Sequence, residues 1–118
     1  MGRTRRGRSM VKQGDIIKVS FGPNSGHEQK GFRPALVISN DEFNKRTKLA
    51  IVCPITNTDN SFPLHVPLDS RTTTTGVILC EHLRTLDLGS RKNKFVEKVP
   101  ADILRKVTDI VSAEVEMI

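Results

Sequence analysis

Polar side chains that can transfer a proton or bind a phosphate gather at three places in this sequence, each beside an apolar run. Functional side chains are commonly carried by loops whose position is fixed by the ends of strands. If neighbouring strands pair, the three groups can therefore meet at one rim of a sheet. The groups are His27-Glu28-Gln29 with Arg33, Thr56, and Glu81-His82 with Arg84.

These residue types suit the cleavage of RNA by its own 2′-hydroxyl. That reaction needs a base for the hydroxyl proton, an acid for the leaving 5′-oxygen, and fixed donors for the negative charge that develops around phosphorus. The guanidinium of Arg33 matches phosphate oxygens, and Thr56 offers a hydroxyl donor. We find no clustered carboxylates of the kind that hold magnesium, so we expect no metal and no cofactor. The acid–base candidates are Glu28, Glu81, His27 and His82.

Length and composition predict one domain, since 118 residues can bury a sizeable core. No apolar run approaches the ~20 residues that span a membrane, and none follows the basic N-terminus as in a secretory signal, so we expect a cytoplasmic protein without a membrane partner. The net charge is +6, but four arginines lie within the first ten residues. We expect residues 1–9 to be a basic disordered tail or leader and residues 10–118 to be the domain. The alternative is a basic arm that binds phosphate.

Three other features are expected to be structural. Cys53 and Cys80 each close an apolar run without further ligands at close spacing, which predicts buried free thiols rather than a metal site or a disulfide. His65 stands between two apolar residues and is expected to be a structural strand residue. The basic run 91–94 is expected to be a solvated loop, with contact to an RNA backbone as the alternative.

The apolar pattern is mainly that of a β protein. Alternating or β-branched runs predict strands at 15–21, 34–39, 49–55, 64–68, 76–81 and 85–88. Pro63 and Pro67 favour an edge position for the strand at 64–68. Between these strands we expect a long glycine-rich loop at 22–33, a helical turn at 41–47, a threonine-rich loop at 69–75 and a basic loop at 89–94.

The C-terminal segment has a helical pattern instead. Pro100 suits the first turn of a helix, and Asp102 lies near the positive end of the helix dipole. Apolar residues from Ile103 to Val111 recur at the 3.6-residue spacing, and this stripe can seal the open end of a curled sheet. The predicted fold is therefore mostly β with a C-terminal α-helix, a small barrel of mostly antiparallel strands.

Several short motifs, taken in order, resemble the MazF/PemK (Kid) family of toxin endoribonucleases. The G-H-E-Q-x-G-x-R-P string is the most specific of them, and the resemblance covers nearly everything outside the basic tail. The matching motifs are G-D-I at 14–16, S-G-H-E-Q at 25–29 with Gly31, R-P-A-L-V at 33–37, P-I-T at 54–56, G-V at 76–77, Glu81, and R-T-L-D at 84–87.

The resemblance implies an SH3-like barrel of the CcdB/PemK kind that works as a homodimer, with single-stranded RNA, including mRNA, in a groove at the dimer interface. It implies sequence-specific, metal-independent cleavage that leaves a 2′,3′-cyclic phosphate or 3′-phosphate and a 5′-hydroxyl. It also implies a cognate antitoxin whose largely disordered acidic tail occupies the groove, and a toxin–antitoxin complex that binds DNA.

Carried over position by position, the resemblance assigns roles to individual residues. Arg33 and Thr56 match the pair most often held essential in the family. Glu28 and His27 match loop residues near the scissile phosphate, and Glu81 stands where some members have a proposed general base. RNA contacts are expected from eight further residues: Ser20, Phe21, Asn24, Gln29, Phe32, Asn57, His82 and Arg84.

Leu79 departs from the PemK branch of the family, which has an arginine there that is proposed as general acid. Leucine cannot give a proton, so the sequence leaves open which group is the base and which is the acid. Three other functions remain as alternatives: a non-enzymatic toxin that poisons DNA gyrase through its C-terminal helix, a plain SH3-like binding module, and a homologue inactivated by Leu79. The gyrase-directed proteins lack the His-Glu-Gln loop and the Arg-Pro that follow one another in this chain.

Overall fold

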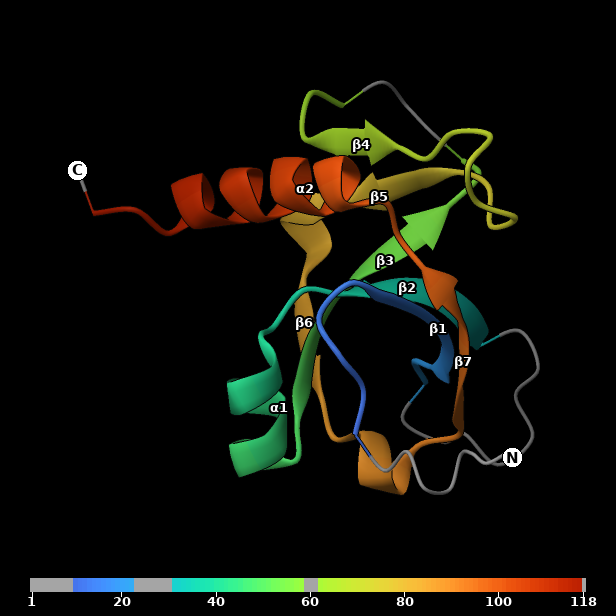
Figure 1. The fold of residues 1–118 in the computed structure, drawn as a ribbon, viewed down its shortest axis with the longest axis vertical. Coiled ribbons are helices and arrows are strands. Elements are labelled where there is room, and N and C mark those ends of the chain that lie inside the picture. Colours follow the sequence, from blue (N-terminus) through green and yellow to red (C-terminus); the bar gives the residue numbers. More distant parts are fainter. Residues whose placement is uncertain (1–9, 23–30, 59–61, 118) are drawn as a thin grey trace.

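The computed structural model describes residues 10–22, 31–58 and 62–117, and its elements follow the predicted order closely (Figure 1). In chain order they are β1 (Asp15–Ser20), β2 (Phe32–Val37), α1 (Asp41–Thr47), β3 (Ala50–Thr56), β4 (His65–Pro67), β5 (Val77–Leu79), the 3-10 helix η2 (Cys80–His82), β6 (Arg84–Leu86), the 3-10 helix η3 (Leu88–Ser90), β7 (Asn93–Lys98) and α2 (Ala101–Glu114). Neither α-helix of this part is long and apolar enough to cross a bilayer.

The strands form one curled antiparallel sheet, which confirms the predicted fold class. Their order is β4-β5-β3-β2-β1-β7, and β6 pairs with the first half of β3. The predicted barrel is not closed within the described residues, because β4 and β7 stand at opposite ends of this order. The position of β4 at one end confirms the edge strand that its two prolines predicted, since proline cannot donate to a neighbouring strand.

Apolar side chains cover both faces of the sheet because successive residues of a strand point to opposite sides. One face packs Ile16, Leu36, Cys53, Ile55 and Ile78 against α2. The opposite face carries Ile17, Val19, Ala35, Val37, Val52 and Leu86. The two faces are named here the helix-covered face and the open face, the second because α2 does not cover it, although its apolar residues are themselves buried.

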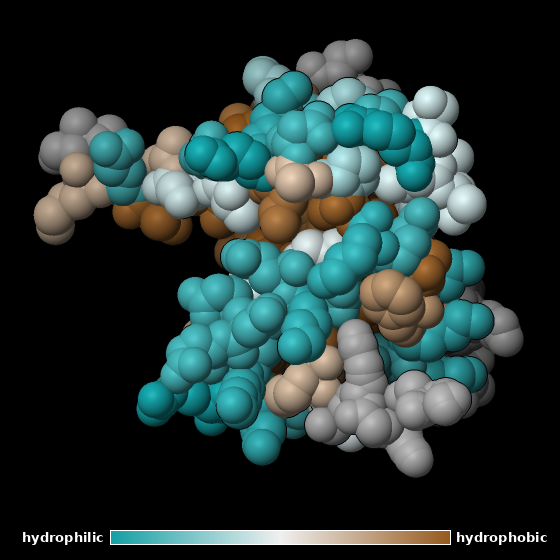
Figure 2. Space-filling view, viewed as in Figure 1, coloured by the Kyte–Doolittle hydropathy of each residue, from teal (hydrophilic) through white to brown (hydrophobic). Residues whose placement is uncertain are grey.

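The helix α2 lies across the helix-covered face, as its apolar stripe predicted. Ile103 and Val107 are buried there, and Leu104, Ile110 and Val111 pack beside them. Figure 2 shows apolar side chains gathered beneath this helix, where it meets the rest of the molecule. The helix begins directly after Pro100, with Asp102 in its first turn. Burial of this stripe is the main reason the segment is helical, because isolated helices of this length are marginal in water.

Two details differ from the sequence prediction. The basic loop expected at 89–94 ends earlier, because β7 begins at Asn93 and pairs with β1. The sequence NKFVEK gave no strand signal, since β7 is a mostly exposed edge strand with one sheet partner. The strand expected at 76–81 ends at Leu79, and Glu81 lies in the tight turn of η2. The first difference occurs where few apolar residues define a pattern, whereas the second occurs in an apolar run that does not show where the strand gives way to a turn.

The two cysteines are buried and free, as predicted. Burial raises the pKa of Cys53, and burial together with the negative charges of Glu114 and Glu81 raises that of Cys80 to about 12. A thiol must ionise to act as a nucleophile or to bind a metal, so both cysteines serve as small apolar core residues.

Candidate active site

Arg33 and Thr56 come from adjacent antiparallel strands. In the register between β2 and β3, Ala35 is paired with Pro54 and Leu36 with Cys53. The paired residues end there, and Arg33 and Thr56 lie two residues beyond them; the same register, if extended, would bring the two residues opposite each other. Figure 1 shows the start of β2 and the end of β3 on the same side of the molecule.

The alternation of side chains puts Arg33 and Thr56 on the same face as well. Side chains an even number of residues apart on a strand point to the same face. Arg33 is two residues from Ala35 and Thr56 is four residues from Val52, and both Ala35 and Val52 lie on the open face. Arg33 is exposed, and Thr56 is half-buried. A long cationic side chain and a short, more rigid hydroxyl therefore face the same side, away from α2.

The Thr56 hydroxyl is held in place by the turn that follows β3. Its oxygen accepts the backbone N–H of Thr58 at 3.1 Å. Accepting uses an oxygen lone pair and leaves the hydroxyl hydrogen to be donated to a phosphate oxygen. The turn thus orients the Thr56 hydroxyl and leaves its hydrogen available to donate.

Gly76 lets a second segment approach the backbone of Thr56. Its φ is +117°, a region that disfavours side chains, and a Cβ at this position would lie 2.4 Å from the Thr56 carbonyl oxygen. The pairing of Thr56 with Val77 begins directly after this glycine. The close approach therefore fixes the backbone that carries the hydroxyl.

The threonine loop, residues 69–75, leads directly into Gly76 and is anchored by side-chain contacts of its own. The Glu97 carboxylate of β7 accepts the backbone N–H and the hydroxyl of both Thr73 and Thr74, at 2.7 to 3.1 Å. Burial acts to raise the pKa of Glu97, but the hydroxyl and N–H groups of Thr74 and Thr73 outweigh it and hold that pKa below its usual value. Four donors on one carboxylate make this loop well ordered despite its lack of apolar residues.

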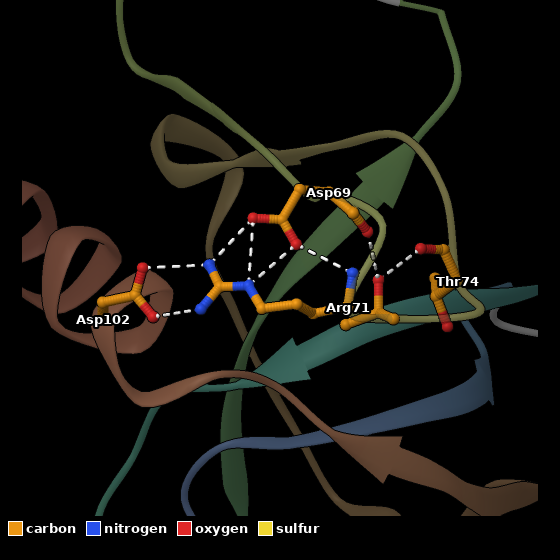
Figure 3. A network of polar contacts seen from close by, with 5 residues as sticks. Asp69, Arg71, Thr74 and Asp102 are labelled. Atoms are coloured by element: carbon orange, nitrogen blue, oxygen red, sulfur yellow. Dashed lines mark hydrogen bonds and ion pairs between the residues drawn. The ribbon is translucent and has the colours of Figure 1, made fainter.

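A second anchor joins the threonine loop to α2. The Arg71 guanidinium lies between the carboxylates of Asp69 and Asp102, and its nitrogens donate to both at 2.8 to 3.2 Å (Figure 3). Hydrogen bonds from Arg71 lower the pKa of Asp69 to about 2. At its far end the loop places the Thr75 hydroxyl on the Asn57 amide oxygen, at 3.0 Å. Asn57, an expected RNA contact, is exposed and follows Thr56 directly.

Glu81 lies in η2, directly after β5, and forms a hydrogen bond with His65, a residue that the sequence predicted to be structural. The His65 Nε2–H donates to Glu81 Oε2 at 2.8 Å, and His82 Nε2 lies 3.6 Å from the same oxygen. The exposed fraction of the side chain rises from 6% for His65 through 22% for Glu81 to 61% for His82. His65 is indeed a buried strand residue, but its carboxylate partner was not foreseen.

The sequence did contain a signal for this pair. The strands predicted at 64–68 and 76–81 flank the threonine loop, and antiparallel pairing of such neighbours is common. The observed register pairs His65 with Leu79, two residues before Glu81. A hairpin hypothesis for these two strands would have brought His65 and Glu81 together.

Phe21 and Phe32, two of the predicted RNA-contacting residues, each form a cation–π contact with a basic side chain. The Arg84 guanidinium stacks 5.2 Å from the centre of the Phe21 ring, and the Lys92 ammonium lies 5.4 Å from that of Phe32. Ser20 is buried, and its carbonyl accepts from Arg91. Arg91 and Lys92 therefore hold the stems of the loop at 22–33, a role that the prediction of a solvated basic loop missed.

His27, Glu28, Gln29 and Asn24 lie outside the described residues, and their roles remain predictions. Within the described ranges, no three His, Cys, Asp or Glu side chains are grouped closely enough to hold a metal ion. The described site can thus supply a guanidinium, a hydroxyl and an imidazole-bonded carboxylate.

Comparison with known proteins gives a consistent family. The model of the PemK-like, MazF-like toxin of type II toxin–antitoxin systems matches residues 12–113. The chain is 39% identical over 106 residues to the endoribonuclease PemK of Escherichia coli, covering 86% of this chain and 80% of that protein.

Solved structures agree with this sequence match. MazF from Deinococcus radiodurans superposes with a TM-score of 0.80 at 35% identity, over 92% of this chain and 98% of that one. The MazE–MazF complex from the same organism gives 0.78 at 30% identity, again over 92% and 98%. With a family match over most of its length and these relatives, the chain belongs to the PemK-like, MazF-like toxins of type II toxin–antitoxin systems.

Proposed function

We propose that this protein is a sequence-specific endoribonuclease that cleaves single-stranded RNA, including mRNA in the cytoplasm, with a phosphate held between Arg33 and Thr56. The observation that supports the proposal is the β2–β3 pairing, which ends two residues before Arg33 and Thr56 and whose register, if extended, would bring the two residues opposite each other. The family and the endoribonuclease relative support the same activity.

The reaction is an internal transfer at phosphorus. The ribose 2′-oxygen forms a bond to phosphorus as the bond to the 5′-oxygen breaks, which leaves a 2′,3′-cyclic phosphate and a 5′-hydroxyl. The 2′-hydroxyl proton passes to a base and the 5′-oxygen receives a proton from an acid, so the overall charge balances. Arg33 neutralises the phosphorane, and Thr56 donates a hydrogen bond to one of its oxygens.

Glu81 is the carboxylate of the described part best suited to be the base. Burial acts to raise its pKa, but its own backbone N–H and the His65 ring outweigh burial, so the pKa lies below its usual value. An ionised carboxylate can accept the 2′-hydroxyl proton. His27 and Glu28 complete the proposed catalytic set from the loop at 22–33, and no metal takes part.

We propose further that the protein acts as a homodimer and is neutralised by an antitoxin. The solved MazE–MazF complex supports an antitoxin partner. Arg33 and Arg84 are exposed on the open face, so an acidic antitoxin segment can occupy the same surface as RNA and exclude it.

The test is cleavage of an unstructured RNA in the presence of EDTA. We expect cuts at one short motif, with cyclic phosphate at the new 3′ ends. A matched RNA with a single 2′-deoxyribose at the cut site should stay intact, because the nucleophile is missing. Random cutting, dependence on added metal, or cleavage of the 2′-deoxy RNA would contradict the mechanism. Inhibition of gyrase with intact RNA would contradict the function itself.

A further inference from the structure

His65 and Glu81 form a partly buried carboxylate–imidazole pair at one edge of the sheet. Of the two histidines in the described ranges, His65 is the covered one and His82 the exposed one. A carboxylate only accepts hydrogen bonds, so the 2.8 Å contact requires a hydrogen on His65 Nε2. The ring is thereby fixed in the form that donates to Glu81.

The position of His65 follows from strand pairing. β4 places it directly across from Leu79 of β5, on the face opposite Val66 and Ile78, and η2 then turns Glu81 back toward it. The Phe62 ring lies 5.5 Å from the imidazole ring. Backbone register and an aromatic neighbour therefore both restrict the ring before the carboxylate is considered.

The other groups around Glu81 make this hydrogen bond important. Glu81 Oε1 is covered and accepts no hydrogen bond from the described residues. His82 faces the carboxylate from η2, Glu114 adds a like charge from α2, and the uncharged thiols of Cys80 and Cys53 lie nearby. Within the described ranges, His65 is thus the side chain from outside η2 that donates a hydrogen bond to the carboxylate.

We propose that His65 is a positioning residue that holds the Glu81 carboxylate in its ionised form and fixed direction for proton transfer from the RNA 2′-hydroxyl. This role rests on the proposed nuclease function. A hydrogen bond to a charged carboxylate stabilises the ionised over the neutral form. Without it, burial and the nearby Glu114 charge favour protonation, and a protonated Glu81 cannot accept the 2′-hydroxyl proton.

The first test compares the pH dependence of kcat in wild type, His65→Leu and His65→Gln. His65→Leu removes the donor, so the acidic limb of the profile should move upward by about one pH unit, the size expected for losing a hydrogen bond to a charged group. Because the wild-type pKa of Glu81 lies below 4.5, the loss should approach its limit of about tenfold only at lower pH and should disappear by about pH 7, where Glu81 is ionised in both proteins. His65→Gln retains an amide N–H and should restore most of the loss.

A melting curve for each variant separates this role from simple support of the fold. If His65→Leu lowers Tm but leaves the acidic limb in place, His65 is merely structural and the proposal fails. In a double-mutant cycle, His65→Leu should add less than about twofold to the loss caused by Glu81→Gln, because its effect acts through Glu81. A full additional loss on that background would also overturn the proposal.

The protonation of His65 can also be measured directly in the wild-type protein, without any variant and without enzyme activity. With three histidines in the chain, nitrogen-15 NMR can assign each imidazole. We expect His65 to carry its hydrogen on Nε2 and to share it with a carboxylate. A neutral ring with its hydrogen on Nδ1 alone overturns the proposal. If the protein does not cut RNA at all, the proposed function fails, while this NMR result still decides whether the pair exists.

Discussion

The two parts of the proposed site are positioned in different ways. Arg33 and Thr56 are placed by backbone pairing, Arg33 with Val19 of β1 and Thr56 with Val77 of β5, and Thr56 also by the turn after β3. Glu81 lies in the short η2 and is placed by the side chain of His65 from the edge strand β4. The comparison teaches that a site can combine a rigid phosphate-binding part with a titratable part whose geometry depends on one hydrogen bond. Mutations in the two parts should therefore differ in their pH signatures.

Loss of the guanidinium should give the largest effect. Arg33→Ala is expected to lower kcat by about 10² or more, the usual consequence of removing a preorganised donor to a developing charge. The loss should be the same across the pH range, in contrast to His65→Leu. Arg46→Ala, at an exposed arginine of α1, is the matched control and should retain activity. A folded Arg33→Ala enzyme with less than a threefold loss removes Arg33 from the mechanism.

Loss of the Thr56 hydroxyl should come next. Thr56→Val keeps the shape and removes the donor, and kcat should fall by roughly 10-fold to 100-fold without a shift of the acidic limb. Thr47→Val is a closely matched control, because the Thr47 oxygen also accepts the N–H two residues later, that of Leu49, at 3.0 Å. Full activity in a folded Thr56→Val protein would make Thr56 structural.

The backbone beneath Thr56 can be disturbed through Gly76. Gly76→Ala introduces a Cβ against the Thr56 carbonyl at a positive φ, so Tm should fall by about 5–10 °C, with a loss of kcat. Gly89→Ala meets only the Asp87 carboxylate at 3.4 Å and should change Tm little. Equal melting temperatures for the two variants would show that the close approach at Gly76 does not support the site.

The threonine loop offers the smallest effect and a defined pH window. The pKa of Glu97 is lower in the folded protein than its ordinary value of 4.5, so its contribution to stability is present above that pH and is lost as the pH falls through the folded-state value. Glu97→Gln should therefore lower the free energy of unfolding by about 1 kcal/mol at pH 7 and by less at pH 3. Urea unfolding at both pH values measures this, and a difference that grows at pH 3 contradicts it.

The sequence predicted the parts of this structure that rest on strong patterns. The runs that became β1, β2 and β3 are apolar and β-branched, and α2 has a clear 3.6-residue stripe, so burial determines both. Arg33 and Thr56 could be assigned to strand ends because each stands at the end of such a run, and their joint contact with one phosphate stays a prediction. β7 could not, because an edge strand with exposed residues has no apolar alternation to reveal it.

Side-chain partners were the harder part. His65 was expected to be structural because its neighbours are apolar, and nothing in one strand specifies which residue lies across from it. Glu81 was expected at a strand end, whereas η2 turns it toward β4. Cross-strand register depends on the conformation of the connecting loop, here the threonine loop held by Glu97 and Arg71, whose contacts come from distant segments.

The central claim is that one phosphate is held by Arg33 and Thr56 together. A structure of the protein with a target RNA carrying 2′-deoxyribose at the cut site tests it most directly, because such an RNA binds without being cleaved. The account predicts that the scissile phosphate accepts hydrogen bonds from the Arg33 guanidinium and from Thr56 Oγ1, both at about 3 Å. A scissile phosphate bound elsewhere, or touching only one of the two side chains, would contradict it.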